Sequence, residues 1–247
     1  MSIAHRCLSH SQWREDVQLW PVLSCAAHMG MRRTAGVGTF VELGAFDGVT
    51  HSNTFLLEKC HGWSGLLIEA SPANFARLQS SGRTAVMLHS AVCDATTRHL
   101  DISADSGEFG GETGLMQAAN FHKFEKRANL TTTARVPCSP LRHLMASNGM
   151  HAATWLSLDV EGAEAKVLQT VDPAVFKIIM VETFQPLFGK KKTREDEEHN
   201  ERVAALIVRG GFARVPALGN RVNHVYIRHD VLRHCNTSHL PLLSGDL

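Results

Sequence analysis

Acidic residues recur in this chain directly after apolar segments. The segment TFVELGAFDG, at residues 39–48, holds Glu42 and Asp47 around two glycines. Three later apolar runs also end on acids, namely Glu69, Asp159 and Glu182. In an open parallel α/β sheet, ligands bind beyond the carboxyl ends of the strands. We therefore expect these carboxylates to converge on one rim, where they could bind a cation or accept a proton.

The charge of the glycine loop indicates which ligand it suits. Loops that bind a pyrophosphate offer glycines and backbone N–H groups, because phosphate is an anion. Asp47 would repel such a group, and the loop GAFDG lacks the G-x-G-x-x-G spacing of a dinucleotide site. A nucleoside with positive charge fits better. S-adenosylmethionine, which carries an ammonium and a sulfonium, meets this description.

Glu69 follows the glycine loop at the distance expected of a ribose ligand. In α/β nucleoside sites an acid about 20 residues beyond the loop accepts both ribose hydroxyls, and Gly48 and Glu69 match that spacing. The spacing fits a nicotinamide dinucleotide as well as S-adenosylmethionine, so only the sequence of the glycine loop favours one cofactor over the other. An acid that merely ends a strand at the surface is the alternative interpretation.

Strands and helices alternate along the chain and would position these acids. Apolar runs predict strands at residues 39–43, 66–69, 86–88, 154–158 and 177–181. Helices are predicted at residues 51–59 with Ser52 or Asn53 as cap, from Ser71-Pro72 onward, and at 139–145, 163–170 and 193–209. Two further strands, at residues 212–215 and 222–228, are predicted to form a hairpin. This order predicts a parallel α/β sheet with helices on both faces and one antiparallel strand.

Composition shifts divide the chain into a central domain and two flanks. Residues 1–38 read as a helical lead-in interrupted by Pro21, residues 39–230 as the main domain, and residues 231–247 as a tail. Residues 103–132 are rich in glycine, serine and acids and predict no clear element, so we interpret them as an insertion or a lid.

Three segments together resemble a known family. FVELGAFDG, LLIEASPANFARL and LSLDVEGAEAKVL are similar to the FkbM-type methyltransferases, a branch of the class I S-adenosylmethionine-dependent enzymes. The resemblance extends from about Thr39 to Arg228, and residues 103–132 depart from it. It implies a three-layer, Rossmann-like class I methyltransferase sheet of seven strands in the order 3-2-1-4-5-7-6, with strand 7 antiparallel.

The resemblance also implies a cofactor site, made by Glu42, Gly44, Asp47, Gly48, Glu69, Ala70, Ser90 and Ala91. The first four would hold the methionine end of S-adenosylmethionine. Glu69 would bind the ribose, and Ser90 and Ala91, with Asp94 nearby, would lie beside the adenine.

Methyl transfer to a hydroxyl requires a base near the moment of attack. Asp159 and Glu182 are the candidates, since both end strands beside the expected position of the methyl group. His51, His122 and His224 are alternative bases. Asp159 could equally be a structural acid that accepts backbone N–H groups of the following turn.

The same two acids, Asp159 and Glu182, could instead hold a magnesium ion that lowers the pKa of a bound hydroxyl. Whether a metal takes part is left open by the sequence. Glu161 and Glu164 stand in the first turn of a predicted helix, where the helix dipole favours acids, and we assign them no catalytic role.

The overall composition excludes several classes of protein. A net charge of +1 over 247 residues argues against a nucleic-acid binder with a broad basic face. No apolar run approaches the roughly 20 residues that span a bilayer. The six cysteines form no C-x-x-C pair and suggest no disulfide framework, so we expect reduced thiols and a cytoplasmic protein. The oligomeric state is left open.

Together these features predict a methyltransferase that uses S-adenosylmethionine. Its acceptor would be a hydroxyl of a small-molecule, sugar or lipid-like compound, and the preference for oxygen rests on the resemblance alone. The alternatives are a nicotinamide-dependent oxidoreductase, and a non-catalytic module that only binds a nucleoside.

Overall fold

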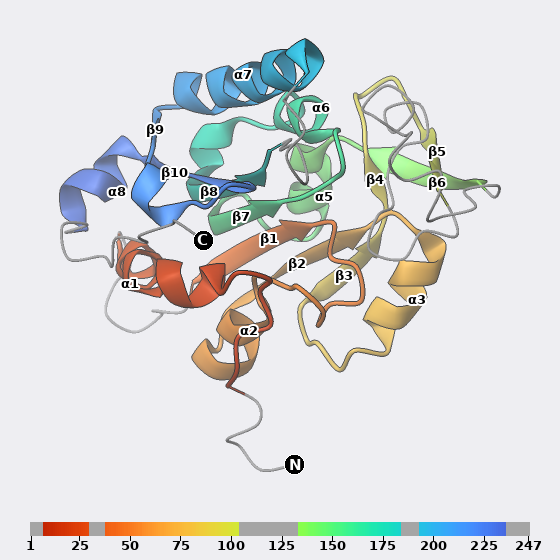
Figure 1. Ribbon diagram of the computed structural model, residues 1–247. Coiled ribbons are helices and arrows are strands. Elements are labelled where there is room, and N and C mark those ends of the chain that lie inside the picture. The colour runs from red at the N-terminus through yellow and green to blue at the C-terminus, as the bar shows by residue number, and fades with distance from the viewer. Residues whose placement is uncertain (1–6, 30–37, 104–132, 184–192, 236–247) are drawn as a thin grey trace.

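The centre of the molecule is a sheet of seven strands in the order β3-β2-β1-β7-β8-β10-β9 (Figure 1). The computed structural model describes residues 7–29, 38–103, 133–183 and 193–235. The strands of the sheet are β1 (Thr39–Leu43), β2 (Ser64–Glu69), β3 (Val86–His89), β7 (Ala153–Leu158), β8 (Phe176–Glu182), β9 (Phe212–Arg214) and β10 (Asn223–Arg228). Helices lie on both faces, which gives the α/β class that the sequence predicts.

Strand direction and order follow the connections. All neighbouring pairs are parallel except those of β10, which runs antiparallel to both β8 and β9. Counted within this sheet alone, the strands have the order 3-2-1-4-5-7-6. Their numbers in the whole chain differ from that expectation, because three additional strands between β3 and β7 form a separate sheet.

Two apolar clusters, one on each face, hold the layers together. One face is covered by α5 (Leu141–Ser147), α6 (Glu164–Leu168) and α7 (Arg194–Arg209). The other is covered by α1 (Glu15–His28), α2 (Phe55–His61), α3 (Pro72–Gln79) and α8 (His229–His234). Successive residues of a strand point to opposite faces, so Trp155 packs in one cluster and Leu156 in the other.

Two helices begin where local signals predict. The hydroxyl of Ser71 accepts a hydrogen bond from the N–H of Asn74, and Pro72 is the first residue of α3. At the start of α7, Thr193 and Asp196 cap each other's backbone N–H groups. Both signals lie within four residues of chain, which is why the sequence suffices to predict them.

The helix predicted at residues 51–59 begins later, at Phe55. Neither of the expected caps acts as one. The Ser52 hydroxyl and the Asn53 N–H both donate to the carboxylate of Glu42 in β1, at 2.9 and 2.8 Å. A contact with a strand ten residues away therefore replaces the predicted local cap.

Helix α1 runs through Pro21, so the predicted interruption of the lead-in is wrong. Proline removes one backbone hydrogen bond, here to the carbonyl of Val17, and normally bends or ends a helix. Leu19 and Leu23 on either side are fully buried against the sheet. Their burial outweighs the lost hydrogen bond and keeps the helix continuous.

A second, three-stranded sheet lies beside the first. Its order is β4 (Ala91–Val92), β6 (Thr133–Ser139) and β5 (His99–Ser103). The sequence analysis predicted none of these strands, because β4 is only two residues long and Pro137 lies within β6. Of the predicted insertion or lid, residues 104–132 lie outside the described residues.

All six cysteines are paired, as Cys7–Cys60, Cys25–Cys235 and Cys93–Cys138. The prediction of reduced thiols is therefore wrong. The partners are 53, 210 and 45 residues apart, so no local spacing motif could reveal them. The cytoplasmic location that we predicted from reduced thiols loses its basis.

Within the described residues, no helix combines the length and the hydropathy that crossing a membrane would require.

Candidate active site

The glycine loop after β1 crosses directly over the backbone that follows β7. The N–H of Asp159 donates to the carbonyl of Leu43 at 3.2 Å, and the N–H of Gly44 donates to Ile68 at 3.1 Å. Gly44 has a φ of +76°, and a Cβ there would lie 1.9 Å from the carbonyl oxygen of Asp159. Only glycine fits this crossing. The loop is thereby placed against the acid that ends the neighbouring strand.

Gly48 closes the same loop and is anchored by a residue that the sequence analysis missed. The guanidinium of Arg83, which is 5% exposed, donates to the Gly48 carbonyl at 2.7 Å and to the hydroxyl of Thr54 at 2.8 Å. It also pairs with Glu58 at 2.7 Å. Arg83 carries no motif, and its role follows only from its position beneath the loop.

Glu42 is turned away from the rim and into the loop. Its carboxylate is 4% exposed and accepts hydrogen bonds from the hydroxyls of Ser52 and Thr54 and from the N–H of Asn53. These donors fix the chain between β1 and α2. The structure thus gives Glu42 an organising role for the loop rather than an open face toward a ligand.

Asp47 organises the loop in the same manner. One of its oxygens accepts the N–H groups of Val49 and Thr50, at 2.8 and 2.7 Å, and the other accepts the Thr50 hydroxyl. The residue remains half-exposed. Its charge is thus still available to a cation on the open side of the loop.

Glu69 joins the glycine loop to the end of β2. Its carboxylate is 6% exposed and accepts the N–H of Phe46 in the loop at 2.8 Å and the N–H of Ser71 at 2.7 Å. Burial raises the pKa of Glu69 to about 7, although hydrogen bonds from Ser71, Phe46 and Ala70 oppose the shift. Glu69 thereby fastens the glycine loop to the turn that follows β2.

A pocket opens beside Glu69, at the seam between the two sheets. Its walls comprise Leu43, Gly44, Ile68, Glu69, Ala70, Ser90, Ala91, Val92, Leu100, Ile102, Asp159, Val160, Ala163 and Val167. The predicted cofactor residues Ala70, Ser90 and Ala91 meet here. Leu100 and Ile102 were missed, because they come from the second sheet, which the sequence did not reveal.

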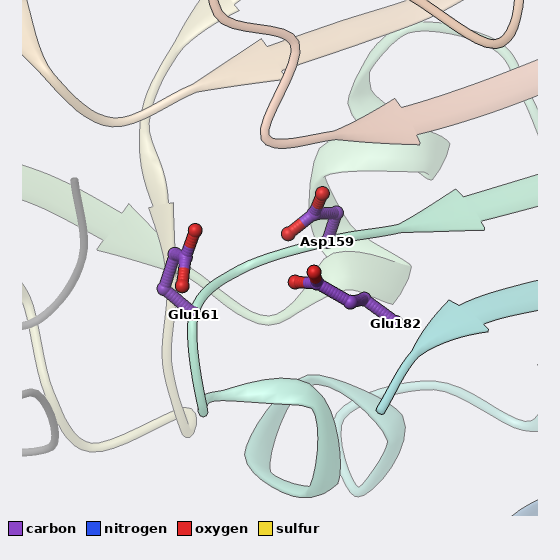
Figure 2. Close-up of side chains that lie close together, drawn as sticks. All are labelled: Asp159, Glu161 and Glu182. Carbon is purple, nitrogen blue, oxygen red and sulfur yellow. The ribbon is translucent and has the colours of Figure 1, made fainter. Parts of the chain in front are cut away.

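Asp159 also belongs to a cluster of three carboxyl groups, with Glu161 and Glu182. Figure 2 shows Asp159 and Glu182 side by side at the ends of β7 and β8, with Glu161 on the loop after β7. One oxygen of each of the three lies within 4.8 Å of the others. The sequence predicted the meeting of Asp159 and Glu182. It did not predict that Glu161 would join them. Glu161 was expected in the first turn of a helix, but its φ of +52° is not helical, and α6 begins only at Glu164.

The three groups repel one another and hold protons more tightly than isolated carboxyls. Burial, followed by the charges of the neighbouring acids, raises the pKa of both Glu161 and Glu182 well above the ordinary value. Burial also raises the pKa of Asp159, although water still reaches its side chain. Asp159 and Glu182 share a hydrogen bond, so the pair retains a proton between them.

Glu164 holds the loop that carries these acids. One of its oxygens accepts the N–H groups of Val160 and Gly162, at 3.2 and 3.1 Å. Its other oxygen contacts Nε2 of His199 in α7 at 2.9 Å. Glu164 is 2% exposed. It therefore acts on the conformation of the loop.

The three histidines proposed as alternative bases lie in different places. His51 is exposed, has a φ of +57° and is near enough for its charge to lower the pKa of Asp159. His224 contacts Arg214 at 2.8 Å and lies opposite Val181 in the sheet. His122 is outside the described residues. Of the two described histidines, His51 is the one whose charge reaches the acid cluster.

Asp94 turns toward its own loop rather than the pocket. It accepts hydrogen bonds from Thr96 and Thr97, which lower its pKa to about 2. It is exposed, and nothing in its contacts associates it with the seam between the sheets.

This arrangement places an apolar pocket, a buried acid and a proton-sharing acid pair in one row along the carboxyl edge. The family match spans the same region. A family model described as "Methyltransferase FkbM domain" matches residues 42–213, from β1 to β9.

The chain belongs to the FkbM methyltransferase family. None of the curated proteins matches it in sequence. The matched FkbM domain includes all of the predicted site residues, from Glu42 to Glu182.

Several solved methyltransferase structures match this chain at low similarity. The O-methyltransferase from Bacillus cereus, in complex with SAH, is 11% identical with a TM-score of 0.39, over 91% of this chain and 86% of that one. The Planctomyces limnophilus O-methyltransferase family 2 protein, in complex with apigenin, is 10% identical with a TM-score of 0.41, over 92% and 65%.

The mitomycin 7-O-methyltransferase MmcR is 12% identical with a TM-score of 0.35, over 86% of this chain and 54% of that one. The chain thus spans about half the length of MmcR. The family assignment rests on the match to the FkbM model and not on these structures.

Proposed function

We propose that this FkbM-family protein transfers a methyl group from S-adenosylmethionine to a hydroxyl oxygen of a small-molecule, sugar or lipid-like acceptor. The observation that carries the proposal is the succession of pocket, Glu69 and acid pair along one edge of the sheet. Each part matches a different portion of the cofactor or of the reaction.

The pocket suits the adenosine portion of the cofactor. Its apolar walls, among them Ile68, Val92 and Ile102, would enclose an adenine ring. Glu69 lines this pocket and already accepts hydrogen bonds from two neighbouring segments of chain, so a ribose hydroxyl would join these donors or replace one of them. The rest of the cofactor would then extend from Glu69 toward Gly44 and Asp159.

The methionine end carries the charges that the rim favours. Asp47 keeps an open side, and Asp159 ends the strand next to the loop. A sulfonium between them would interact favourably with both carboxylates, whereas a pyrophosphate would be repelled. This contrast disfavours the nicotinamide-dependent oxidoreductase. Titration with the reduced dinucleotide, followed by its fluorescence, would reveal binding if that alternative were correct.

The chemical role of the acid pair is to accept the proton of the acceptor hydroxyl. The bond from oxygen to the methyl carbon forms as the carbon–sulfur bond breaks, S-adenosylhomocysteine leaves, and the proton passes to the ionised member of Asp159 and Glu182. Their raised pKa values bring the pair nearer the neutral range, where a general base works best.

A divalent metal is the second possibility for the same acids. Three carboxylates within 4.8 Å of one another could bind magnesium, which would ionise a bound hydroxyl directly. Prolonged dialysis against EDTA separates the two routes. Full methyl-transfer activity after dialysis would contradict a role for the metal. Loss of activity that magnesium alone restores would support it.

The direct test of the function begins with binding. Calorimetry should show that the oxidised protein binds S-adenosylhomocysteine, and that Glu69→Gln weakens the binding. Methyl transfer is then measured with a labelled cofactor on panels of hydroxylated small molecules, sugars and lipids, with an RNA panel beside them.

Binding without transfer to any panel would favour the non-catalytic module. No binding would contradict the proposal.

The division of the chain is part of the proposal. We take residues 39–230 as the methyltransferase unit, with 103–132 as an insertion, residues 1–38 as lead-in and 231–247 as tail. The described parts of both flanks contact each other, since Cys25 of α1 is bonded to Cys235 after α8. The flanks would therefore support the unit rather than fold separately.

A further inference from the structure

Every cysteine of the chain has a partner, and the partners come from distant segments. Cys7 joins the start of the chain to α2, and Cys25 joins α1 to the end of α8. A protein that keeps its thiols reduced has no reason to bring six cysteines together in three pairs with none left over. Such pairing is the mark of proteins that fold in an oxidising compartment.

The third pair differs from the other two in its location. Cys93 directly follows β4, and Cys138 lies in β6 opposite Ala91. Both are buried, at 6% and 7% exposure. The bond therefore lies inside the second sheet, whereas Cys7–Cys60 ties the start of the chain to α2 and Cys25–Cys235 ties α1 to the residue after α8.

That sheet forms one wall of the pocket. Ala91 and Val92 of β4 and Leu100 and Ile102 of β5 face the residues of the central sheet across the seam. The Cys93–Cys138 bond begins one residue after Val92. The bond thus ties β4, which lines the pocket, to its neighbour β6.

Apart from the disulfide, β4 is held by short backbone pairing and a few hydrogen bonds, among them the one from the Cys93 N–H to the Ser139 carbonyl at 3.3 Å. β4 pairs with β6 over only two residues, through Ala91 and Val92. The buried core of the second sheet comprises five residues, Ala91, Cys93, Ile102, Val136 and Cys138. Two of these five are the bonded cysteines themselves. The disulfide therefore adds a covalent tie to a small core, which is the situation in which disulfides commonly contribute most.

We propose that the Cys93–Cys138 disulfide is a positioning element of the cofactor pocket, and that the protein matures in an oxidising compartment where this bond forms. The inference rests on the proposed function in one respect, namely that the pocket holds the adenosine of S-adenosylmethionine. Reduction would remove the covalent tie between β4 and β6 and loosen the adenine wall, while the acid pair after β7 and β8 stays in place.

The test compares two double variants that each remove one disulfide. Cys93→Ser with Cys138→Ser should weaken binding of S-adenosylhomocysteine and raise KM for S-adenosylmethionine by about tenfold, with kcat within about twofold of the parent. The matched control, Cys25→Ser with Cys235→Ser, should lower the melting temperature yet keep the affinity. Equal affinities in the two variants would overturn the proposal.

A second measurement covers failure of the serine variant to fold. The wild-type protein is reduced stepwise with a phosphine, and alkylation of each cysteine is followed by mass spectrometry beside the affinity for S-adenosylhomocysteine. Affinity should fall as Cys93 and Cys138 become alkylated. Retention of full affinity after their alkylation would overturn the proposal.

The compartment is tested by mapping peptides of the unreduced protein after export into an oxidising compartment of the expression host. Three linked pairs are expected, and free Cys93 or Cys138 in a fully binding protein would contradict the inference. Oxidised protein that carries all three bonds but binds no S-adenosylhomocysteine would instead contradict the proposed function. The two failures are thus distinguishable.

Discussion

The glycine loop and the acid cluster treat their carboxylates in opposite ways. In the loop, Glu42 and Asp47 are surrounded by hydroxyl and backbone N–H donors. In the cluster, the described contacts of Asp159 and Glu182 are with each other and with further acids. Carboxylates whose oxygens are satisfied order the backbone. Those that meet mainly like charges are held ready for a proton or a cation, which is where chemistry becomes possible.

The largest expected effect is on kcat, from a substitution in the acid cluster that leaves the glycine loop intact. Asp159→Asn removes a proton acceptor but keeps the size of the side chain. We expect kcat to fall by about 100-fold or more, the usual contribution of a general base. Affinity for S-adenosylhomocysteine, measured by calorimetry, should change little. An unfolded variant would instead support the structural interpretation of Asp159.

The second prediction concerns pH and Glu69. Its pKa is raised from 4.5 to about 7 in the folded protein, so the folded state holds a proton that the unfolded state releases. The stability it contributes is complete below pH 4.5 and is lost as the pH rises through 7. The loss is about 3 kcal/mol.

Urea unfolding of the ligand-free protein at pH 5 and pH 8 measures this loss. Glu69→Gln should reduce the difference by about the amount that Glu69 contributes, and the acid cluster, whose pKa values are also raised, accounts for the remainder. If the free energy of unfolding falls equally between pH 5 and pH 8 in the wild type and in Glu69→Gln, other groups, such as the acid cluster, cause the pH dependence.

The third prediction concerns binding by the loop side. Asp47→Ala and Glu69→Ala should each weaken cofactor binding by about 1–3 kcal/mol, since each loses hydrogen bonds to a charged group. Asp172→Ala is the matched control, because Asp172 also accepts a backbone N–H in a turn but lies before β8, at the other end of the sheet. The control should bind as the wild type does. Unchanged calorimetric affinity in both site variants would refute the pocket assignment.

The smallest effect is expected at the support of the acid loop. His199→Ala removes the contact of α7 with Glu164, which in turn holds Val160 and Gly162. We expect kcat to fall by about threefold to tenfold, because the loop is loosened and no reacting group is lost. A fall as large as that of Asp159→Asn would mean that His199 takes part in the reaction itself.

Much of the fold could be predicted from short stretches of sequence. The caps at Ser71 and Thr193 and the hairpin of β9 and β10 depend on neighbours in the chain. The second sheet could not be predicted, since the two residues of β4 become a strand only beside β6, which follows 40 residues later. Likewise, helix α1 continues through Pro21 only because its face is buried.

The sequence by itself determined which residues end the strands, and therefore that Glu69, Asp159 and Glu182 share one edge, because parallel strands present their carboxyl ends together. Only the tertiary structure decided what each acid does there. It supplied the donors that occupy Glu42, the left-handed turn that brings Glu161 to the cluster, and the three cysteine pairs. These contacts join segments distant along the chain, so no local pattern of residue types encodes them.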